Sequence, residues 1–202
     1  MPHEGLWEQL EKLDCKKTAK QAKCQFIDNP KRYIVTMLNS DYSVNLSDRN
    51  IFLLGNDSPE KPASFLEQLC ILAYLINAQN LPLTGKLVGA RTLPGGQFFF
   101  RGLHRLPTKK LEKAFGSLPE NVYQILDQFD ARKRKFGDAS IQLYVLPRVP
   151  LTIVIWRQCE EFGARASILF DQTAASQLPL DALLTAVNLT VESLIKAATQ
   201  NS

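Results

Sequence analysis

Three strongly apolar segments in the last third of the chain constrain its fold more than any other feature. They are residues 140–146, 151–157 and 165–170. Apolar side chains stand there at successive as well as alternate positions, as in Leu143-Tyr144-Val145. A strand of this composition is stable only when both of its faces are covered. The segments therefore predict the centre of a β-sheet with other elements packed on it.

Two helices are expected to cover this sheet. Residues 62–79 are predicted to form a helix with a very wide apolar face, so the helix should be largely buried. Residues 179–199 place leucine and valine at helical spacing to the end of the segment. A helical segment at about 4–24 precedes an antiparallel meander between Arg32 and Leu54. We therefore expect an α+β fold, a mostly antiparallel sheet with packed helices, in a single domain over 1–202.

Two local motifs add detail. Pro94-Gly95 suits the centre of a type II turn, which predicts a hairpin between 87–92 and 97–103. The three phenylalanines that follow would then belong to a strand covered on both faces. Ser117 and Glu120 have the spacing of a capping box, which predicts a helix from Ser117 onward.

Composition excludes several classes of protein. The chain has 45% hydrophobic residues and 24 Lys+Arg against 20 Asp+Glu, with both signs spread along it. It is therefore neither disordered nor built as a nucleic-acid binder. The one dense basic run, 132–135, is interpreted as a solvated helix end, with a phosphate-binding patch as the alternative. With no secretory leader, no membrane span and four scattered cysteines, we expect a cytoplasmic protein.

One end of the predicted sheet gathers the residues most capable of chemistry. Pairing the strands about the connector 147–150 places Asp138 opposite Cys159 and Glu160, and Glu161 extends the same end. Crowded carboxylates raise one another's pKa, which general acid–base catalysis requires. The cluster is consistent with a ligand pocket, with a carboxylate pair that acts alone or on a divalent metal, or with a solvated loop. Trp156, in the adjoining strand, is either core or the wall of that pocket.

Four further polar residues are given roles by their positions along the chain. The opposite end of the sheet should bring Arg148 and Asp171 together as a structural ion pair. Arg101 and His104 are possible polar contributors to a ligand site, although a lone histidine is more often structural. No metal-ligand spacing, nucleophile elbow or nucleotide-binding loop is present, so no cofactor can be named.

A set of short motifs along nearly the whole chain resembles domain of unknown function family 3786. The motifs are Leu72 to Leu75, Pro82 to Lys86, Gly95 to His104, Gly137 to Ala139, Leu146 to Leu151, Trp156, Glu160 to Phe162 and Ile168 to Asp171. The resemblance implies a bacterial or archaeal protein, mostly of anaerobes, with no settled activity. Some members are joined to a cysteine-rich iron–sulfur module, which has no counterpart in the isolated Cys15 and Cys24.

These observations favour a non-catalytic module that binds a small molecule or cofactor, as an accessory to anaerobic redox or one-carbon metabolism. Its site would comprise Asp138, Trp156, Glu160, Glu161, Arg101 and His104. An enzyme with a carboxylate acid–base pair is the alternative, and a protein–protein adaptor is the third. A small molecule or a protein is therefore the expected partner, neither nucleic acid nor membrane is expected, and the oligomeric state stays open.

Overall fold

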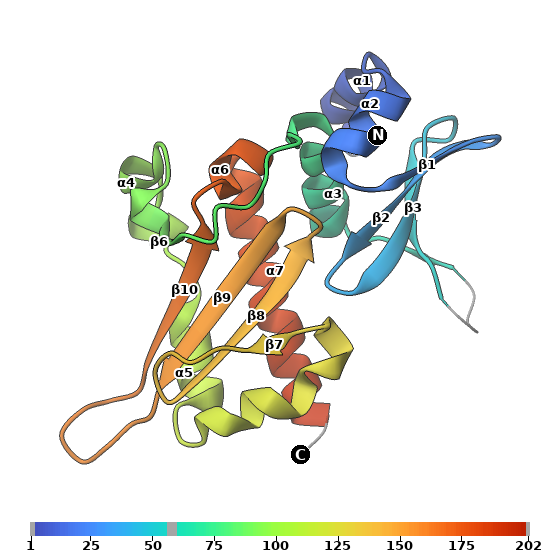
Figure 1. The fold of residues 1–202 in the computed structure, drawn as a ribbon. Coiled ribbons are helices and arrows are strands. Elements are labelled where there is room, and N and C mark those ends of the chain that lie inside the picture. Colours follow the sequence, from blue (N-terminus) through green and yellow to red (C-terminus); the bar gives the residue numbers. More distant parts are fainter. Residues whose placement is uncertain (1–2, 56–59, 201–202) are drawn as a thin grey trace.

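The computed structural model describes residues 3–55 and 60–200, and Figure 1 shows two antiparallel sheets with helices packed on them. The predicted α+β class is confirmed, with the strands divided between two five-stranded sheets. Apolar side chains from both sheets and from the helices form one buried cluster. Within the described ranges, no helix is long and apolar enough to cross a membrane.

The N-terminal sheet has the strand order β1-β2-β3-β4-β5; the expected meander corresponds to β2, β3 and β4, and β1 and β5 extend it on either side. Its strands are β1 (Gln25–Asp28), β2 (Lys31–Met37), β3 (Ser40–Asn45), β4 (Asn50–Leu53) and β5 (Lys61–Pro62). The helices α1 (Glu4–Glu11) and α2 (Cys15–Ala22) precede it. The turn between β2 and β3 consists of Leu38 and Asn39, both with positive φ, which is the backbone that closes a two-residue hairpin without splaying its strands.

The helix α3 (Phe65–Asn77) is the buried helix that the sequence predicts for 62–79. It begins later than expected because Ser64 forms a capping box with Glu67, while Lys61 and Pro62 pair with β4. Its central residues, from Cys70 to Leu75, are fully or almost fully buried. They lie between the N-terminal helices and α7 (Leu180–Gln200), so α3 connects the two halves of the core.

The C-terminal sheet has the order β6-β10-β9-β8-β7. Its strands are β6 (Leu87–Gly89), β7 (Arg132–Lys133), β8 (Ala139–Leu146), β9 (Val149–Trp156) and β10 (Arg165–Asp171). The central strand β9 is buried on both faces up to Ile155, as predicted. Its neighbours differ, because Gln142 and Leu169 are only half-buried and Tyr144 is exposed on one face. The long helix α7 runs behind this sheet (Figure 1).

The predicted hairpin over 87–103 is wrong. The turn itself forms, since the Gly96 N–H donates to the Leu93 carbonyl oxygen and Gly95 has a φ of 74°. Helical turns flank it instead of strands: η1 (Ala90–Thr92), α4 (Gly96–Phe99) and η2 (Gly102–His104). A helical turn rotates successive side chains about 100°, so Phe100 enters the core while Phe98 stays 71% exposed.

The predicted capping box at Ser117 is also wrong. Residues after α5 (Thr108–Phe115) form the 3-10 helices η3 (Pro119–Ile125) and η4 (Asp127–Phe129). The side chain of Glu120 pairs with Arg157, more than thirty residues away, and no side chain caps η3. A tertiary ion pair has therefore replaced the local motif. A short helix, α6 (Ala174–Gln177), then leads into α7.

The pairing of β8 with β9 differs from the expected register. The turn contains only Pro147 and Arg148, and the ladder shifts between Tyr144 and Leu146. Ala139 consequently lies opposite Ile155. The shift brings Asp138 beside Arg157 rather than opposite Cys159 and Glu160, so the expected juxtaposition of the carboxylates is wrong.

We expect Gly96→Ala to destabilise the protein by about 1–3 kcal/mol, because a Cβ there would overlap the carbonyl oxygen of Ala90. Gly89→Ala is the matched control, since nothing lies within 4 Å of a Cβ at that position. It should change the free energy of unfolding by less than about 0.5 kcal/mol. Urea unfolding followed by tryptophan fluorescence measures both, and equal effects would contradict the close packing of α4 on η1.

Candidate functional site

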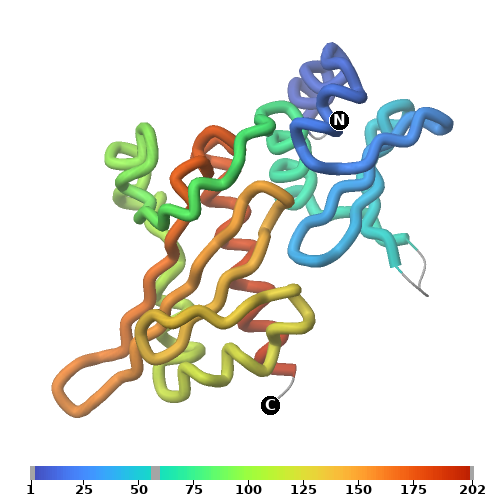
Figure 2. Tube along the Cα trace, viewed as in Figure 1, coloured from blue at the N-terminus to red at the C-terminus, as the bar shows by residue number. Residues whose placement is uncertain are grey.

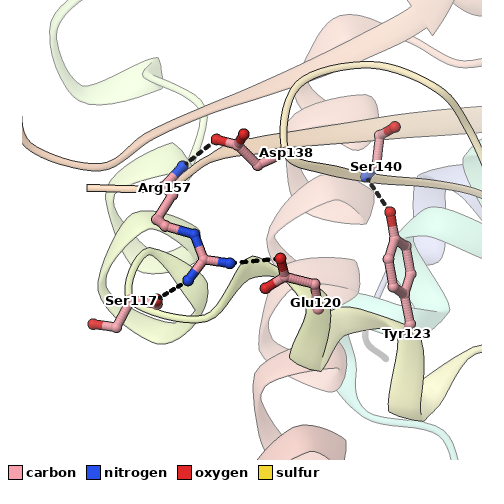
Figure 3. A network of polar contacts seen from close by, with 6 residues as sticks. All are labelled: Ser117, Glu120, Tyr123, Asp138, Ser140 and Arg157. Atoms are coloured by element: carbon pink, nitrogen blue, oxygen red, sulfur yellow. Dashed lines mark hydrogen bonds and ion pairs between the residues drawn. The ribbon is translucent and has the colours of Figure 1, made fainter. Parts of the chain in front are cut away.

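Asp138 belongs to a polar network that holds the end of β9 (Figure 3). Its carboxylate accepts a hydrogen bond of 2.7 Å from the backbone N–H of Arg157. The guanidinium of Arg157 donates to the Ser117 carbonyl oxygen and to the Glu120 carboxylate. Alongside it, the Tyr123 hydroxyl accepts from the Ser140 N–H. The network ties η3 to the sheet, and Asp138 takes part in it as a structural acceptor.

The other residues predicted at this end lie on the surface. The chain between β9 and β10 projects away from the sheet as an orange loop in Figure 2. Glu160 and Glu161 are exposed on that loop, and neither side chain has a hydrogen bond or ion pair within the described residues. Trp156 is 38% exposed and contacts the guanidinium of Arg165 at 5.8 Å from the ring centre.

Arg148 and Asp171 each have partners other than the expected one. The guanidinium of Arg148 donates to the Gln21 carbonyl oxygen and to the Asn80 side chain, both at 2.6 Å. Asp171 is 2% exposed and accepts hydrogen bonds from Thr84, Gly85 and Thr173. No ion pair joins Arg148 to Asp171 in the part of the chain that the structure describes.

Asp171 therefore anchors the segment that precedes β6. Two of its donors, Thr84 and Gly85, lie just before that strand, and β6 itself pairs with β10 through Leu87 and Asp171. Burial raises the pKa of the Asp171 carboxyl, but the hydrogen bonds from Thr173, Thr84 and Gly85 outweigh it and hold the pKa below the ordinary value of 3.8. The carboxylate is thus a fixed anion that fastens the segment to the sheet.

Arg101 and His104 follow α4, and the α4 segment lies near the end of β10 that is farther from the acidic loop (Figure 1). His104 stacks on Phe99 with ring centres 4.5 Å apart, and the guanidinium of Arg101 lies 5.8 Å from the centre of the Phe98 ring. Both side chains are exposed. The structure therefore separates them from Asp138, Trp156, Glu160 and Glu161, and the six predicted residues do not form one site.

A pocket of about 520 Å³ lies next to Arg101 and His104, between the turns after β6 and the start of α5. Its lining is Gly89, Ala90, Arg91, Phe100, Arg105, Leu106, Thr108 and Lys109. Phe100 is buried and gives the pocket an apolar floor, whereas Arg91 and Arg105 are exposed. Neither arginine has a side-chain hydrogen bond or ion pair among the described residues. Lys109 pairs with Glu112 at 2.7 Å.

The sequence carries a signal for this pocket that local motifs do not reveal. From Gln68 to Leu111 the chain has no acidic residue. The same stretch contains six cationic side chains, Lys86, Arg91, Arg101, Arg105, Lys109 and Lys110. The expectation that both signs of charge are spread along the chain is therefore wrong for this stretch, whose local excess is concealed by the net charge of +4. When such a stretch folds around an apolar floor, its cations line the pocket and make it positively charged.

Two of the four free cysteines, Cys24 and Cys70, have their thiols suppressed by burial. Burial raises the pKa of Cys24 and Cys70 to about 12, so both are neutral thiols at physiological pH. Within the described ranges, His, Cys, Asp and Glu do not gather in groups of three that could hold a metal ion.

This geometry defines an α+β chain with a cationic surface pocket. The chain belongs to the family described as domain of unknown function (DUF3786), whose family model matches residues 14–193. The resemblance seen in the short motifs is thereby confirmed. Neither the search of curated proteins nor the search of solved structures finds a match.

We expect Asp171→Asn to lower the free energy of unfolding at pH 7 by about 1–3 kcal/mol, because several buried donors lose their anionic acceptor. The folded pKa of Asp171 lies below the ordinary value of 3.8, so its contribution is present above that pH and is lost as the pH falls through the folded pKa. The difference between the wild type and the variant should therefore shrink below about pH 4.

Urea unfolding at several pH values between 7 and 3 measures this difference. Asp127→Asn is the matched control, because the exposed Asp127 side chain makes no hydrogen bond within the described residues. A stability loss in Asp171→Asn that is the same at pH 3 and pH 7 would contradict the anchoring role.

Proposed function

We propose that this protein is a non-catalytic binding module whose ligand is a small organic anion with phosphate or carboxylate groups. The observation that carries the proposal is the pocket of about 520 Å³, in which every charged lining residue is a cation: Arg91, Arg105 and Lys109. An accessory role in anaerobic redox or one-carbon metabolism is proposed with it, on the strength of the resemblance described above.

The composition of the pocket supports this class of ligand. The arginine fork donates to phosphate and carboxylate oxygens in pairs. Among the described residues, no carboxylate pairs with Arg91 or Arg105. The apolar floor of Phe100 and Leu106 would cover the carbon skeleton of an organic anion. Lys109 adds a cation that already interacts with Glu112, so the two arginines are expected to dominate affinity.

A binding role is favoured over catalysis because the pocket lining offers no general base. The uncharged polar side chain in the pocket lining is that of Thr108, which carries a hydroxyl group. The alternative, a carboxylate acid–base pair, required Asp138 and the glutamates to converge, whereas Asp138 accepts from Arg157 and the glutamates stand on a projecting loop. We therefore propose no reaction for this site.

A protein–protein adaptor is the second candidate, and one observation favours it. Leu103 is 99% exposed and Phe98 is 71% exposed on the surface beside the pocket. Aromatic side chains and arginine are enriched in protein–protein interfaces. An adaptor requires no small molecule, so native mass spectrometry of anaerobically purified protein separates the two proposals.

We expect Arg91→Gln and Arg105→Gln each to weaken anion binding by about tenfold or more, because each removes a charge-assisted bidentate contact. Isothermal titration calorimetry with pyrophosphate and with citrate measures the effect and separates phosphate from carboxylate preference. Lys86→Gln is the matched control, since it removes a cation from the same acid-free stretch outside the pocket.

Binding should also weaken as salt is raised, since the contacts are ionic. The proposal fails if neither probe binds and no small molecule accompanies the purified protein. It fails equally if Lys86→Gln costs as much affinity as the two pocket variants.

A further inference from the structure

A second pocket lies where the two sheets meet. The hairpin between β2 and β3 contacts β8 of the C-terminal sheet through the hydrogen bond from the Leu38 N–H to the Val145 carbonyl oxygen. It contacts η4 through the hydrogen bond from the Asn39 amide to the Gln128 carbonyl oxygen. A groove of about 420 Å³ opens beside this contact. Its lining is Lys23, Thr36, Asn39, Phe129, Asp130, Arg132, Tyr144, Leu146 and Pro147.

The groove combines an apolar floor with unpaired charges of both signs. Leu146 is 1% exposed and Phe129 is 8% exposed. Lys23, Asp130 and Arg132 are exposed, and their side chains make no hydrogen bond or ion pair within the described residues. The groove thus presents two cations and one carboxylate, none of which is neutralised by an internal partner.

The backbone holds these groups at the groove in a conformation that favours glycine. Lys23 ends α2 with a φ of 51°, and Asp130 follows η4 with a φ of 44°. Asn39, in the hairpin, has a φ of 62°. Glycine would adopt these angles at less cost. A ligand-binding role for these side chains would account for the conformational cost of the positive φ angles.

The charge pattern defines the ligand. Two cations match two carboxylates, one anion matches one ammonium group, and the Tyr144 hydroxyl and Asn39 amide supply neutral hydrogen bonds. We infer that the groove between the sheets is a binding site for an acidic α-amino acid, with Arg132 and Lys23 holding its carboxylates and Asp130 its ammonium group. This site is separate from the cationic pocket, which has no carboxylate in its lining to receive an ammonium group.

Calorimetric titration of the full chain with three small molecules tests the inference. L-glutamate should bind with saturation at one site. Glutarate, which lacks the ammonium group, should bind at least about tenfold more weakly, because the contact with Asp130 is lost. L-lysine, which carries one carboxylate and two ammonium groups, should show no saturable binding. No binding of L-glutamate at millimolar concentration, or equal affinity for glutarate, overturns the inference.

Variants locate the site and separate it from the cationic pocket. Arg132→Gln should weaken L-glutamate binding at least about tenfold, and Asp130→Asn should abolish the preference for L-glutamate over glutarate. Lys135→Gln is the matched control, since it removes a cation from the same basic run outside the groove lining. If Lys135→Gln has the same effect as Arg132→Gln, or if Arg91→Gln does, binding is not at the groove.

Discussion

The antiparallel pairing of β9 with β8 and β10 is the interaction on which the rest of the structure depends. Burial of each large aliphatic side chain of β9 contributes roughly 1.5–3 kcal/mol. Both faces of β9 are buried, so a slip of one residue would exchange the side chains on the two faces and disrupt the close packing of both. An exposed ion pair such as Arg157–Glu120 contributes at most about 1 kcal/mol. The register is therefore set by the core, and the position of Asp138 follows from it.

The cationic pocket follows from the same strand pairing. β10 pairs with β6, and Asp171 at its end fixes the residues before β6. Farther along β10, the Ala166 N–H donates to Glu112 of α5. The chain between these two anchors is attached at both ends and leaves the sheet in short helical turns. A rigid sheet that holds an irregular segment at both ends is a common basis for a binding site.

Sequence patterns predicted the elements whose burial is decided by their own side chains. The strands β8 to β10 and the helices α3 and α7 are apolar enough that few other structures could bury them. Local motifs failed where distant residues decide the outcome. Glu120 has the spacing of a capping box with Ser117, but its carboxylate pairs with the Arg157 guanidinium instead. Pro94 and Gly95 form their turn, but a turn does not specify that strands flank it.

The candidate sites were less accessible to sequence reasoning for a related reason. The predicted cluster depended on a strand register, and the two-residue turn at Pro147 and Arg148, together with the ladder shift between Tyr144 and Leu146, moves Asp138 away from the acidic loop. The acid-free stretch before Glu112 could have been identified from the sequence alone, because the positions of charged residues along the chain do not depend on the tertiary structure. The groove between the sheets could not, because Lys23, Asn39 and Asp130 come together only through the packing of the β2–β3 hairpin on the second sheet.

Local rather than total charge decides what each pocket can bind. Interactions between exposed charges are largely screened beyond about 8 Å at physiological ionic strength. The net charge of +4 is therefore almost irrelevant to a ligand in either pocket. A ligand in the first meets only cations, whereas a ligand in the groove also meets Asp130. Under the two proposals, Asp130 would repel a pure anion and attract an ammonium group, so the groove would select a zwitterion where the cationic pocket selects an anion.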